Sequence, residues 1–564
     1  MRLKSLRWTL LLLFVVLALG SMVLAQDDDL EGDDGIGDPY YPLMGNGGYD
    51  VLHYTIDLAV DMQQNIIAGS TTLDVVATQD LSQFNLDFSG LDISLITING
   101  EEAEFARAGR ELTIIPVTML SDADLFEIVV SYSGEPGQSG GWNYYGSGVM
   151  VAGEPISASG WYPVNEHPLD KSTYTFMITV DDQFDVGANG ILEDTVENED
   201  GTLTYVFEAR DPMASYLTTL AIGDFDIITD ETESGVPIRH YFASGLPQST
   251  IDDFARTAEM IDFFETVFGP YPFETYGVVV HDVPLGFALE TQTLSVFGNS
   301  FTGEGVAAHE LAHQWFGDSV SVASWQHIWL NEGFATYAEA LWLEFTLGET
   351  EFQDIMANRY QNWVNPSFSA TRQEIVDFFN NIPMRGVELT ADEADEALTF
   401  LFGQNLEREQ IVRMLDSIRA DGVTGAEIIE AVDETSFLQV DLTLDGLYNF
   451  LIILGLDDIA ENFEQSFVPA GDPTPNALFD GAVYQRGGLT LHALRRVIGD
   501  DDFFTLLRTY TETYHDSNVQ TADFITLAEE ISGQNLGDFF DAWLFEERIP
   551  DIPEDDLFLD DFLG

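Results

Sequence analysis

The sequence predicts an all-β domain of sandwich type, followed by an α-rich domain that carries a helical insertion. Over residues 49 to about 228, apolar and polar positions alternate in runs rich in β-branched residues, which is the period of half-buried strands. Beyond Gly245 the apolar residues recur at helical spacing instead. The chain has 564 residues, 45% of them hydrophobic, and this is enough material for two or more cores.

The first 25 residues have the pattern of a signal peptide. Three basic residues precede an apolar run over residues 8–19, and Val23 and Ala25 then supply the small side chains of a cleavage site. This arrangement predicts cleavage after Ala25 and a secreted or extracytoplasmic protein. An uncleaved anchor helix is the alternative, but the apolar run is short for a membrane span.

A leader and the β domain come next. Residues 26–39 are mostly Asp, Glu and Gly and cannot bury enough apolar surface to become ordered, so we expect an acidic flexible leader over residues 26–44. The β domain is expected over residues 45–245. Its clearest predicted strands are HYTIDLAVDM, STTLDVVA, FEIVVSY, STYTFMITV and LTYVFEA.

The second half of the chain is predicted to be α-rich. Helices are expected over residues 249–268, 306–316 and 325–347, with a short strand over 277–281. The helical domain then comprises residues 246–364 and 476–564. Residues 365–475 contain successive acidic amphipathic segments without lysine or tryptophan, and we interpret them as a helical insertion.

The charge of the chain excludes several partners. Acidic residues number 98 against 20 basic ones, a formal net charge of -78, which repels phosphate backbones and anionic membranes. We therefore expect no nucleic-acid partner and, after signal cleavage, no stable membrane insertion. The sequence has no cysteine, so disulfides, thiol catalysis and Cys-based zinc sites are excluded. Lysine occurs only at Lys4 and Lys171.

A candidate metal site begins with His309-Glu310-Leu311-Ala312-His313, an HExxH sequence in a helical pattern. Residues four apart lie on one helix face, so both imidazoles can point at one metal while Glu310 projects toward a metal-bound water. Two core histidines on a helix are the structural alternative.

A third ligand is predicted from the residues that follow. The first helix should stop near Gly317, and a second helix, folded back antiparallel, would bring Glu332 to the same metal. Two imidazoles and one carboxylate leave a fourth zinc position open for water, which is the catalytic arrangement. The layout with a third His ten residues after the first is absent, because Ser319 occupies that position. We expect one Zn²⁺ per chain.

These segments resemble a known family. HELAHQWFGDSV followed by WLNEGFATYAE is similar to the aminopeptidase N family of zinc metallopeptidases (gluzincins), whose motif is HExxH, eighteen residues and Glu; residues 314–331 supply this interval. The resemblance covers residues 49–364 and 479–550. It implies a saddle-like N-terminal domain, a thermolysin-like catalytic domain, His309, His313 and Glu332 as zinc ligands, and Glu310 as general base.

Three further roles are implied by the same resemblance. Phe287-Ala288-Leu289-Glu290-Thr291 matches the family's Gly-x-Met-Glu-Asn segment at Glu290, whose carboxylate would hold the free amino group of the substrate. Glu154, upstream of Trp161-Tyr162-Pro163, would also contact this amine. Tyr484 stands in a segment similar to Tyr-x-Lys-Gly, with Arg486 in place of Lys, and would donate a hydrogen bond to the developing oxyanion.

The sequence thus predicts a secreted zinc-dependent aminopeptidase that acts on peptides, with metal-activated water and Glu310 as general base. Three alternatives stay open: a zinc endopeptidase, an epoxide hydrolase of the same fold, and a catalytically inactive binding protein. The oligomeric state is not predicted.

Overall fold

The structure is a computed structural model of the chain, and it describes residues 30–137, 141–364, 367–370, 440–443 and 468–559. Two compact units are present. The first runs to Leu343 and also includes Thr474–Leu478 and Ile498–Leu536, whereas the second combines Glu344–Pro473, Phe479–Val497 and the residues from Gly537 onward. A strand-rich N-terminal part followed by a helical part confirms the predicted fold class.

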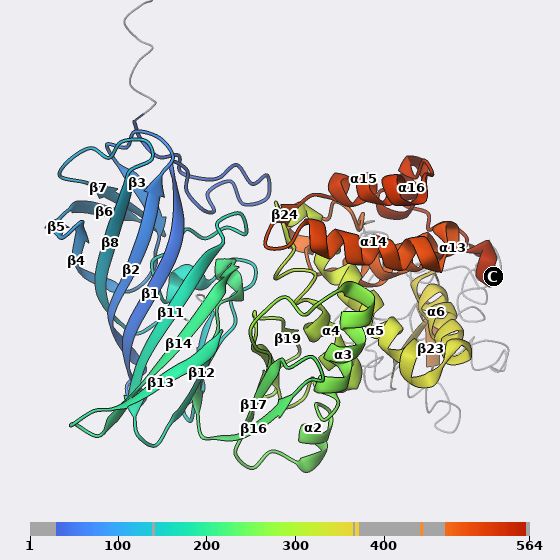
Figure 1. Cartoon of the computed structure of the whole chain (residues 1–564), viewed down its shortest axis with the longest axis horizontal. Coiled ribbons are helices and arrows are strands. Elements are labelled where there is room, and N and C mark those ends of the chain that lie inside the picture. Colours follow the sequence, from blue (N-terminus) through green and yellow to red (C-terminus); the bar gives the residue numbers. More distant parts are fainter. Residues whose placement is uncertain (1–29, 138–140, 365–366, 371–439, 444–467, 560–564) are drawn as a thin grey trace, which may run out of the picture. The chain divides into compact units, whose positions relative to one another are not determined.

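An eight-stranded sheet dominates the N-terminal part, in the order β13-β14-β11-β1-β2-β8-β4-β5. Its long central strands run side by side (Figure 1). Only the pair β1 and β11 is parallel. The strands are β1 (Tyr49–Asp61), β2 (Ile66–Ala77), β4 (Asp92–Ile98), β5 (Glu101–Glu102), β8 (Leu125–Gly134), β11 (Ser172–Asp181), β13 (Ile191–Glu197) and β14 (Thr202–Met213).

Two smaller sheets complete this part. One has the order β3-β7-β6 and the other β12-β15-β10-β9. Their strands are β3 (Phe84–Asp87), β6 (Glu104–Ala108), β7 (Glu111–Ile115), β9 (Trp142–Tyr144), β10 (Val149–Val151), β12 (Asp185–Ala188) and β15 (Leu220–Gly223), and the short helices η2 (Ala158–Gly160) and η3 (Ser215–Leu217) lie in the connections. The core includes the fully buried rings of Tyr54, Tyr162 and Tyr174, of which Tyr54 and Tyr174 stack.

A five-stranded sheet, β16-β17-β18-β20-β19, changes the predicted domain boundary at residue 245. Its strands are β16 (Phe225–Glu231), β17 (Pro237–Ala243), β18 (Val278–His281), β19 (Ala288–Leu289) and β20 (Ser295–Gly298). Strand β17 precedes residue 245 but pairs in parallel with β18, which follows it. Alternating polarity identifies strands, not their partners, so the sequence pattern placed the boundary after two strands that belong to the next sheet.

The helices of the second half are close to those predicted. They are α2 (Gln248–Asp252), α3 (Thr257–Phe268), α4 (Glu304–Ala312), η4 (Trp325–His327), α5 (Trp329–Leu347), α6 (Glu349–Val364), η6 (Pro475–Ala477), η7 (Ala482–Arg486), α13 (Gly487–Ile498), α14 (Asp500–Thr513), α15 (Thr521–Ser532), α16 (Gly537–Leu544) and η8 (Pro553–Asp555). The helix expected over 249–268 is divided into α2 and α3. In the first unit, α14 packs against both α3 and α15, and β21 (Ser321–Val322) pairs with β24 (Asn518–Val519).

Two predicted segments fall mainly outside the described residues. The signal peptide, residues 1–25, lies wholly outside them, and so does most of the predicted helical insertion over 365–475. Within that insertion the described residues include a pair of antiparallel strands, β22 (Ser367–Ala370) and β23 (Val440–Thr443), which the sequence pattern did not predict. Among the described helices, none has the length and apolarity needed to span a bilayer.

The structure differs from the predicted flexible leader, residues 26–44, in the part that it describes, which begins at residue 30. Asp38 is buried there: its carboxylate accepts hydrogen bonds from the backbone N–H groups of Tyr40, Tyr41 and Trp325 and lies 3.2 Å from His167 Nε2. Composition predicted disorder because acidic residues rarely bury themselves. Here the hydrogen bonds to Asp38 compensate for the hydration that its carboxylate loses on burial. They also attach the segment to the rest of the protein.

Asp38 should contribute to stability in a defined pH range. Burial alone would raise its pKa, but the hydrogen bonds from His167 and the backbone lower it from 3.8 to about 2. Because the pKa falls on folding, this contribution is complete above about pH 4 and is lost as the pH falls toward 2. We expect Asp38→Asn to lower the free energy of unfolding by about 2 kcal/mol near neutral pH, measured by urea denaturation. The exposed Asp33→Asn in the same segment is the control; equal stability of both variants would contradict the prediction.

Candidate metal centre

Helix α4 and the turn after it hold the two histidines of the HExxH sequence. The helix ends at Ala312, one residue before His313, so it is shorter than the predicted 306–316. The i, i+4 spacing nevertheless keeps both rings on one face, with their centroids 4.8 Å apart and their planes at 73°. Both side chains are buried, and their position is set by helix geometry.

A glycine turn directs the chain from α4 toward α5. Gly317 has a φ of 135°, and a Cβ atom there would lie 3.3 Å from His313 Nδ1 and 3.3 Å from Asn331 Nδ2. Only glycine combines this backbone conformation with so close an approach. The helix predicted from residue 325 begins as the 3₁₀ turn η4 and continues as α5, so that Glu332 lies in the first turn of α5.

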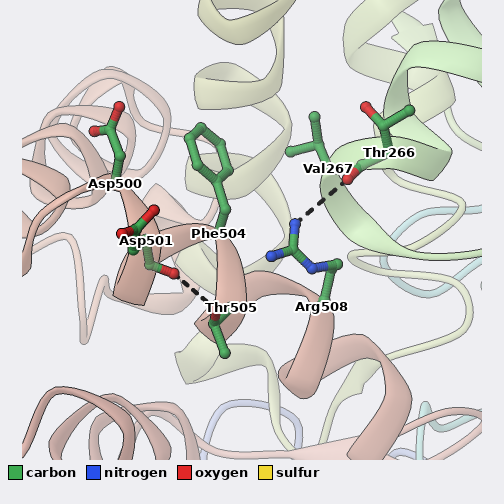
Figure 2. A pocket seen from close by; sticks show the side chains of 7 residues that line it. All are labelled: Thr266, Val267, Asp500, Asp501, Phe504, Thr505 and Arg508. Carbon is green, nitrogen blue, oxygen red and sulfur yellow. Dashed lines mark hydrogen bonds between the residues drawn. The ribbon is translucent and has the colours of Figure 1, made fainter.

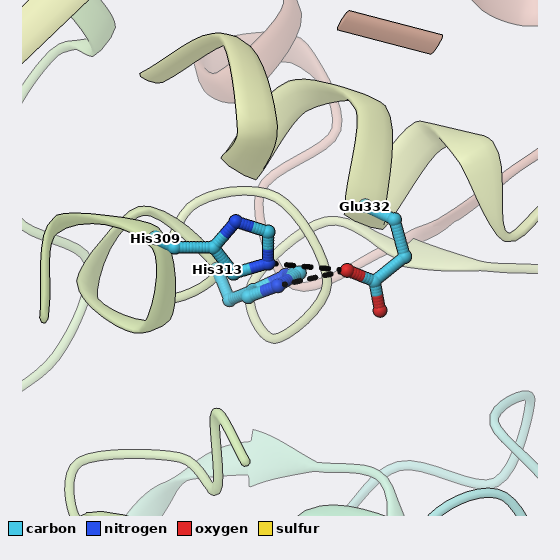
Figure 3. Close-up of side chains that lie close together, drawn as sticks. All are labelled: His309, His313 and Glu332. Carbon is cyan, nitrogen blue, oxygen red and sulfur yellow. Dashed lines mark hydrogen bonds and ion pairs between the residues drawn. The ribbon is translucent and has the colours of Figure 1, made fainter. Parts of the chain in front are cut away.

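Glu332 meets both imidazoles across this turn. Its Oε2 atom lies 3.2 Å from His309 Nε2 and 3.4 Å from His313 Nε2, as Figure 3 shows. The ligand atoms of the three residues all lie within 4.8 Å of one another. The structure therefore brings together the three residues that the sequence predicted as ligands.

The remaining ring nitrogens are held from outside the cluster. His309 Nδ1 lies 2.7 Å from Glu339 Oε1, and His313 Nδ1 lies 3.0 Å from the carbonyl oxygen of Phe316. If each Nδ1 carries the hydrogen and donates it, the Nε2 lone pairs face Glu332 and have the orientation of metal ligands. Glu339 was not predicted, although it stands seven residues after Glu332 and thus two helical turns further along α5.

The electrostatics of the three residues fit a divalent cation. Burial opposes a charged imidazole, but hydrogen bonds to Glu332 and Glu339 raise the pKa of His309 well above its ordinary value. Burial would likewise raise the pKa of Glu332, yet the two imidazoles lower it to about 2. Positive charge is thus stabilised between these side chains. Two imidazoles and one carboxylate are a donor set that suits Zn²⁺ with an open fourth position.

Glu310 lies beside this cluster. One of its carboxylate oxygens, together with ligand atoms of Glu290 and His313, forms a group whose members all lie within 4.8 Å of one another. The side chain is buried, and burial raises the pKa of its carboxyl from 4.5 to about 8. A carboxyl group with a pKa near neutrality is suited to accept and return a proton.

Glu290 is positioned by the end of strand β19 and by helix α4. Leu289 packs into the apolar core with Met150 and Val296, and alternation along the strand directs the next side chain to the opposite face. Gln314 Nε2 donates to the carbonyl oxygen of Glu290 at 3.0 Å, and its Oε1 accepts from the backbone N–H of Thr293 at 2.8 Å. Gln314 directly follows His313, so its two hydrogen bonds attach the segment around Glu290 to the HExxH sequence. The sequence pattern did not predict this role of Gln314.

Glu154 comes from the N-terminal part of the first unit and lies close to Glu290. Carboxylate oxygens of Glu154, Glu290 and Glu332 all lie within 4.8 Å of one another. Glu154 Oε1 and Glu290 Oε1 are buried and have no hydrogen-bond partner among the described residues. Burial, and after it the charge of Glu290, raise the pKa of Glu154 well above its ordinary value.

Lys171 connects the N-terminal strands to the turn after α4. It directly precedes β11, and its Nζ atom donates to the carbonyl oxygens of Asp318 and Ser319 at 2.9 Å and 2.8 Å. The Asp318 side chain is fully buried, and burial with the nearby Glu290 raises its pKa well above the ordinary value. The sequence showed only that lysine is rare; the partner of Lys171 follows from the fold.

Tyr484, the predicted oxyanion donor, lies in the second unit, in the π-helical turn η7. The structure explains Arg486 in the same turn. Its buried guanidinium donates to the carbonyl oxygens at the end of α16 and beyond, namely those of Ala542, Trp543, Glu546 and Glu547. A lysine offers fewer donors in a fixed geometry, so arginine suits this position. The role of Tyr484 stays a prediction.

A separate surface pocket of about 520 Å³ lies between α3 and α14. Figure 2 shows its lining side chains, among them Arg508, which donates to the carbonyl oxygen of Thr266 at 3.4 Å. The others are Val267, Asp500, Asp501, Phe504 and Thr505. None of the predicted site residues lines this pocket.

Comparisons with known proteins identify the family that the chain matches. The chain matches the Peptidase M1 N-terminal domain over residues 51–217 and the Peptidase family M1 domain over residues 253–383 and 455–543. The second match leaves out residues 384–454, which fall within the predicted insertion.

The structure resembles that of an M1 zinc metallopeptidase from Deinococcus radiodurans, with 27% sequence identity, a TM-score of 0.67 and coverage of 92% of this chain and 98% of that one. A mutant of that peptidase has been solved with a Tyr-Ser-Ala substrate.

Two curated relatives are longer than this chain. Endoplasmic reticulum aminopeptidase 2 of Homo sapiens is 25% identical over 54% of this chain and 36% of its own length. Leucine aminopeptidase 2 of Yarrowia lipolytica is 30% identical over 50% of this chain and 46% of its own length. The matched part of this chain thus spans between about a third and a half of these relatives.

Glu339 provides a test of the metal centre. We expect Glu339→Gln to weaken zinc binding by about 10- to 100-fold, because loss of the carboxylate leaves the His309 ring less well oriented and less basic. The measurement is zinc retention during titration with a chelator, with Glu197→Gln, an exposed residue of β13, as control. Unchanged zinc affinity in Glu339→Gln would show that the contact does not support the metal.

Proposed function

The chain belongs to peptidase family M1, and from this premise we propose that it is a zinc-dependent aminopeptidase, which removes N-terminal residues from peptides. One observation carries the proposal: the carboxylates of Glu154 and Glu290, each with a buried Oε1 atom that has no hydrogen-bond partner among the described residues, lie beside the His309, His313 and Glu332 cluster. A buried negative pair needs a cation. The α-ammonium group at the start of a peptide is such a cation.

His309 Nε2, His313 Nε2 and Glu332 hold the zinc ion in this proposal. Bound zinc supplies Lewis-acid polarisation of the scissile carbonyl and lowers the pKa of water. Glu310 takes a proton from the attacking water and returns it to the leaving amine. Its burial and raised pKa suit both transfers.

Glu154 and Glu290 set the register of cleavage. Their carboxylates accept hydrogen bonds from the substrate's ammonium group, which charge assistance makes strong. Because the amine is fixed next to the metal ligands, the peptide bond that reaches Glu310 is the first one. Tyr484 would donate its phenolic hydrogen to the oxyanion that develops on this carbonyl, a role supported by the family resemblance.

The same pair of glutamates weighs against the alternative enzymes. An endopeptidase acts on an internal bond and an epoxide hydrolase on an uncharged ring, so neither reaction places an ammonium group beside Glu154 and Glu290. An inactive binding protein has no chemical need for a proton acceptor such as Glu310 beside the three ligands. We also propose that the enzyme is exported, on the strength of the signal pattern in residues 1–25.

The free amine of the substrate gives the first test. We expect Tyr-Ser-Ala to lose its N-terminal tyrosine, whereas N-acetyl-Tyr-Ser-Ala should be cleaved at least about 100-fold more slowly, because it brings no charge to Glu154 and Glu290. Product analysis by mass spectrometry measures both rates and identifies the bond that breaks. Equal cleavage of the two peptides, or cleavage at the second bond, would reject the aminopeptidase assignment.

Glu310 gives the second test. Glu310→Gln keeps the shape of the side chain but removes the proton acceptor, so we expect kcat to fall by about 100- to 10,000-fold. Zinc content, measured by elemental analysis, should stay at that of the unmodified protein, because Glu310 is not a ligand in the proposal. Glu197→Gln again serves as the control. A variant that keeps its zinc and also its turnover would exclude Glu310 as the base.

A further inference from the structure

Five buried or partly buried carboxyl groups surround the candidate metal centre. The carboxylates of Glu154, Glu290, Glu310, Glu332 and Asp318 act on one another. Among the described residues, positive charge acts on Glu290 from the two imidazoles and on Asp318 from the ammonium of Lys171. Buried charges that exceed their counter-charges are costly. Before a peptide arrives, a cation bound among these carboxyl groups would stabilise their ionised form.

Three of these carboxylates share one small space. Oxygens of Glu154, Glu290 and Glu332 lie within 4.8 Å of one another. Glu290 is 2% exposed, and its Oε1, like Glu154 Oε1, is buried and has no hydrogen-bond partner within the part of the chain that the structure describes. Figure 3 shows that one oxygen of Glu332 faces the two imidazoles while the other points away from them. Glu332 belongs both to the group with the two imidazoles and to the group with Glu154 and Glu290.

The dimensions fit a single cation. Calcium–oxygen bonds are about 2.3–2.6 Å long, so oxygens up to about twice that distance apart can bind the same ion. The donors are all carboxylate oxygens, without nitrogen or sulfur, and such donors favour hard cations such as Ca²⁺ and Mn²⁺ over softer metals. The net charge of -78 also concentrates cations around the protein.

We propose that Glu154, Glu290 and Glu332 form a second cation site, which binds a hard divalent ion of the Ca²⁺ or Mn²⁺ type and shares Glu332 with zinc. The ion occupies the position of the substrate's ammonium group, so peptide and ion exclude each other. The competition rests on the proposed function, since it assumes that Glu154 and Glu290 hold the amine. Binding of the ion does not depend on turnover and can be measured without it. The resting enzyme is then held in a cation-bound state that a peptide N-terminus releases.

Mn²⁺ binding to the zinc-loaded full chain tests the site directly. Electron paramagnetic resonance at high ionic strength, which suppresses binding to the acidic surface, should detect one tightly bound Mn²⁺ per chain, while elemental analysis still finds the zinc. Glu154→Gln and Glu290→Gln should each weaken this ion at least about tenfold, and Ca²⁺ should displace it. Glu310→Gln and the surface control Glu197→Gln should retain it.

Several outcomes would overturn the proposal. They are the absence of a tight Mn²⁺, equal Mn²⁺ affinity in Glu154→Gln, Glu290→Gln and Glu197→Gln, and replacement of the zinc by Mn²⁺. Zinc content and circular dichroism of each variant show whether a lost ion reflects a lost fold. If either Glu154→Gln or Glu290→Gln does not fold, the Mn²⁺ affinity of the other variant still tests the site.

The competition is measured without turnover, in zinc-loaded Glu310→Gln. Tyr-Ser-Ala should release the bound Mn²⁺, and N-acetyl-Tyr-Ser-Ala should not. In the active enzyme, Mn²⁺ should raise KM for a leucine amide reporter and leave kcat unchanged. Release by neither peptide would overturn the shared site. If Mn²⁺ does not bind but cleavage still requires a free amine, the second cation site fails while the proposed function stands.

Discussion

The approach of Glu332 to two imidazoles across a single glycine turn is the contact on which the rest of the site depends. Gly317 permits the chain to turn where a Cβ atom would lie 3.3 Å from His313 Nδ1, and the first turn of α5 presents Glu332 Oε2 to both Nε2 atoms. Glu339, on the same helix, holds His309 from the other side. One helix thus supplies both a candidate ligand and the group that orients another. A shift of α5 along its axis would disturb both contacts together.

Around this centre, the protein accumulates negative charge and supplies little positive charge of its own. Zinc and, in our proposals, the substrate's amine and a second divalent ion are the cations that complete it. Such a site discriminates by charge before it discriminates by shape, because a neutral group cannot compensate buried carboxylates. Leu289, the residue before Glu290, packs into the core, and the Glu290 carboxylate then faces the site.

The sequence predicted the features that depend on local spacing. HExxH on a helix, and the interval to Glu332, identified the cluster because helix geometry converts sequence distance into spatial distance. It did not predict Gln314 as the anchor of the Glu290 segment or the carbonyl partners of Lys171, since these contacts join elements whose pairing is tertiary. The pairing of β17 with β18 was missed for the same reason. Residues 30–44 were misjudged because composition describes an average, whereas Asp38 owes its burial to particular donors.

The position of Lys171 and Glu154 before the five-stranded sheet has a consequence for how such a protein can be rebuilt. Both residues come from the N-terminal strand region, yet one holds the turn after α4 and the other lies next to Glu290. A chimera that exchanged the N-terminal region for that of a homologue would therefore also exchange part of the site. The two halves are a matched set rather than interchangeable modules, and a recombination point that preserves the chemistry must be chosen by contacts, not by the change from strands to helices.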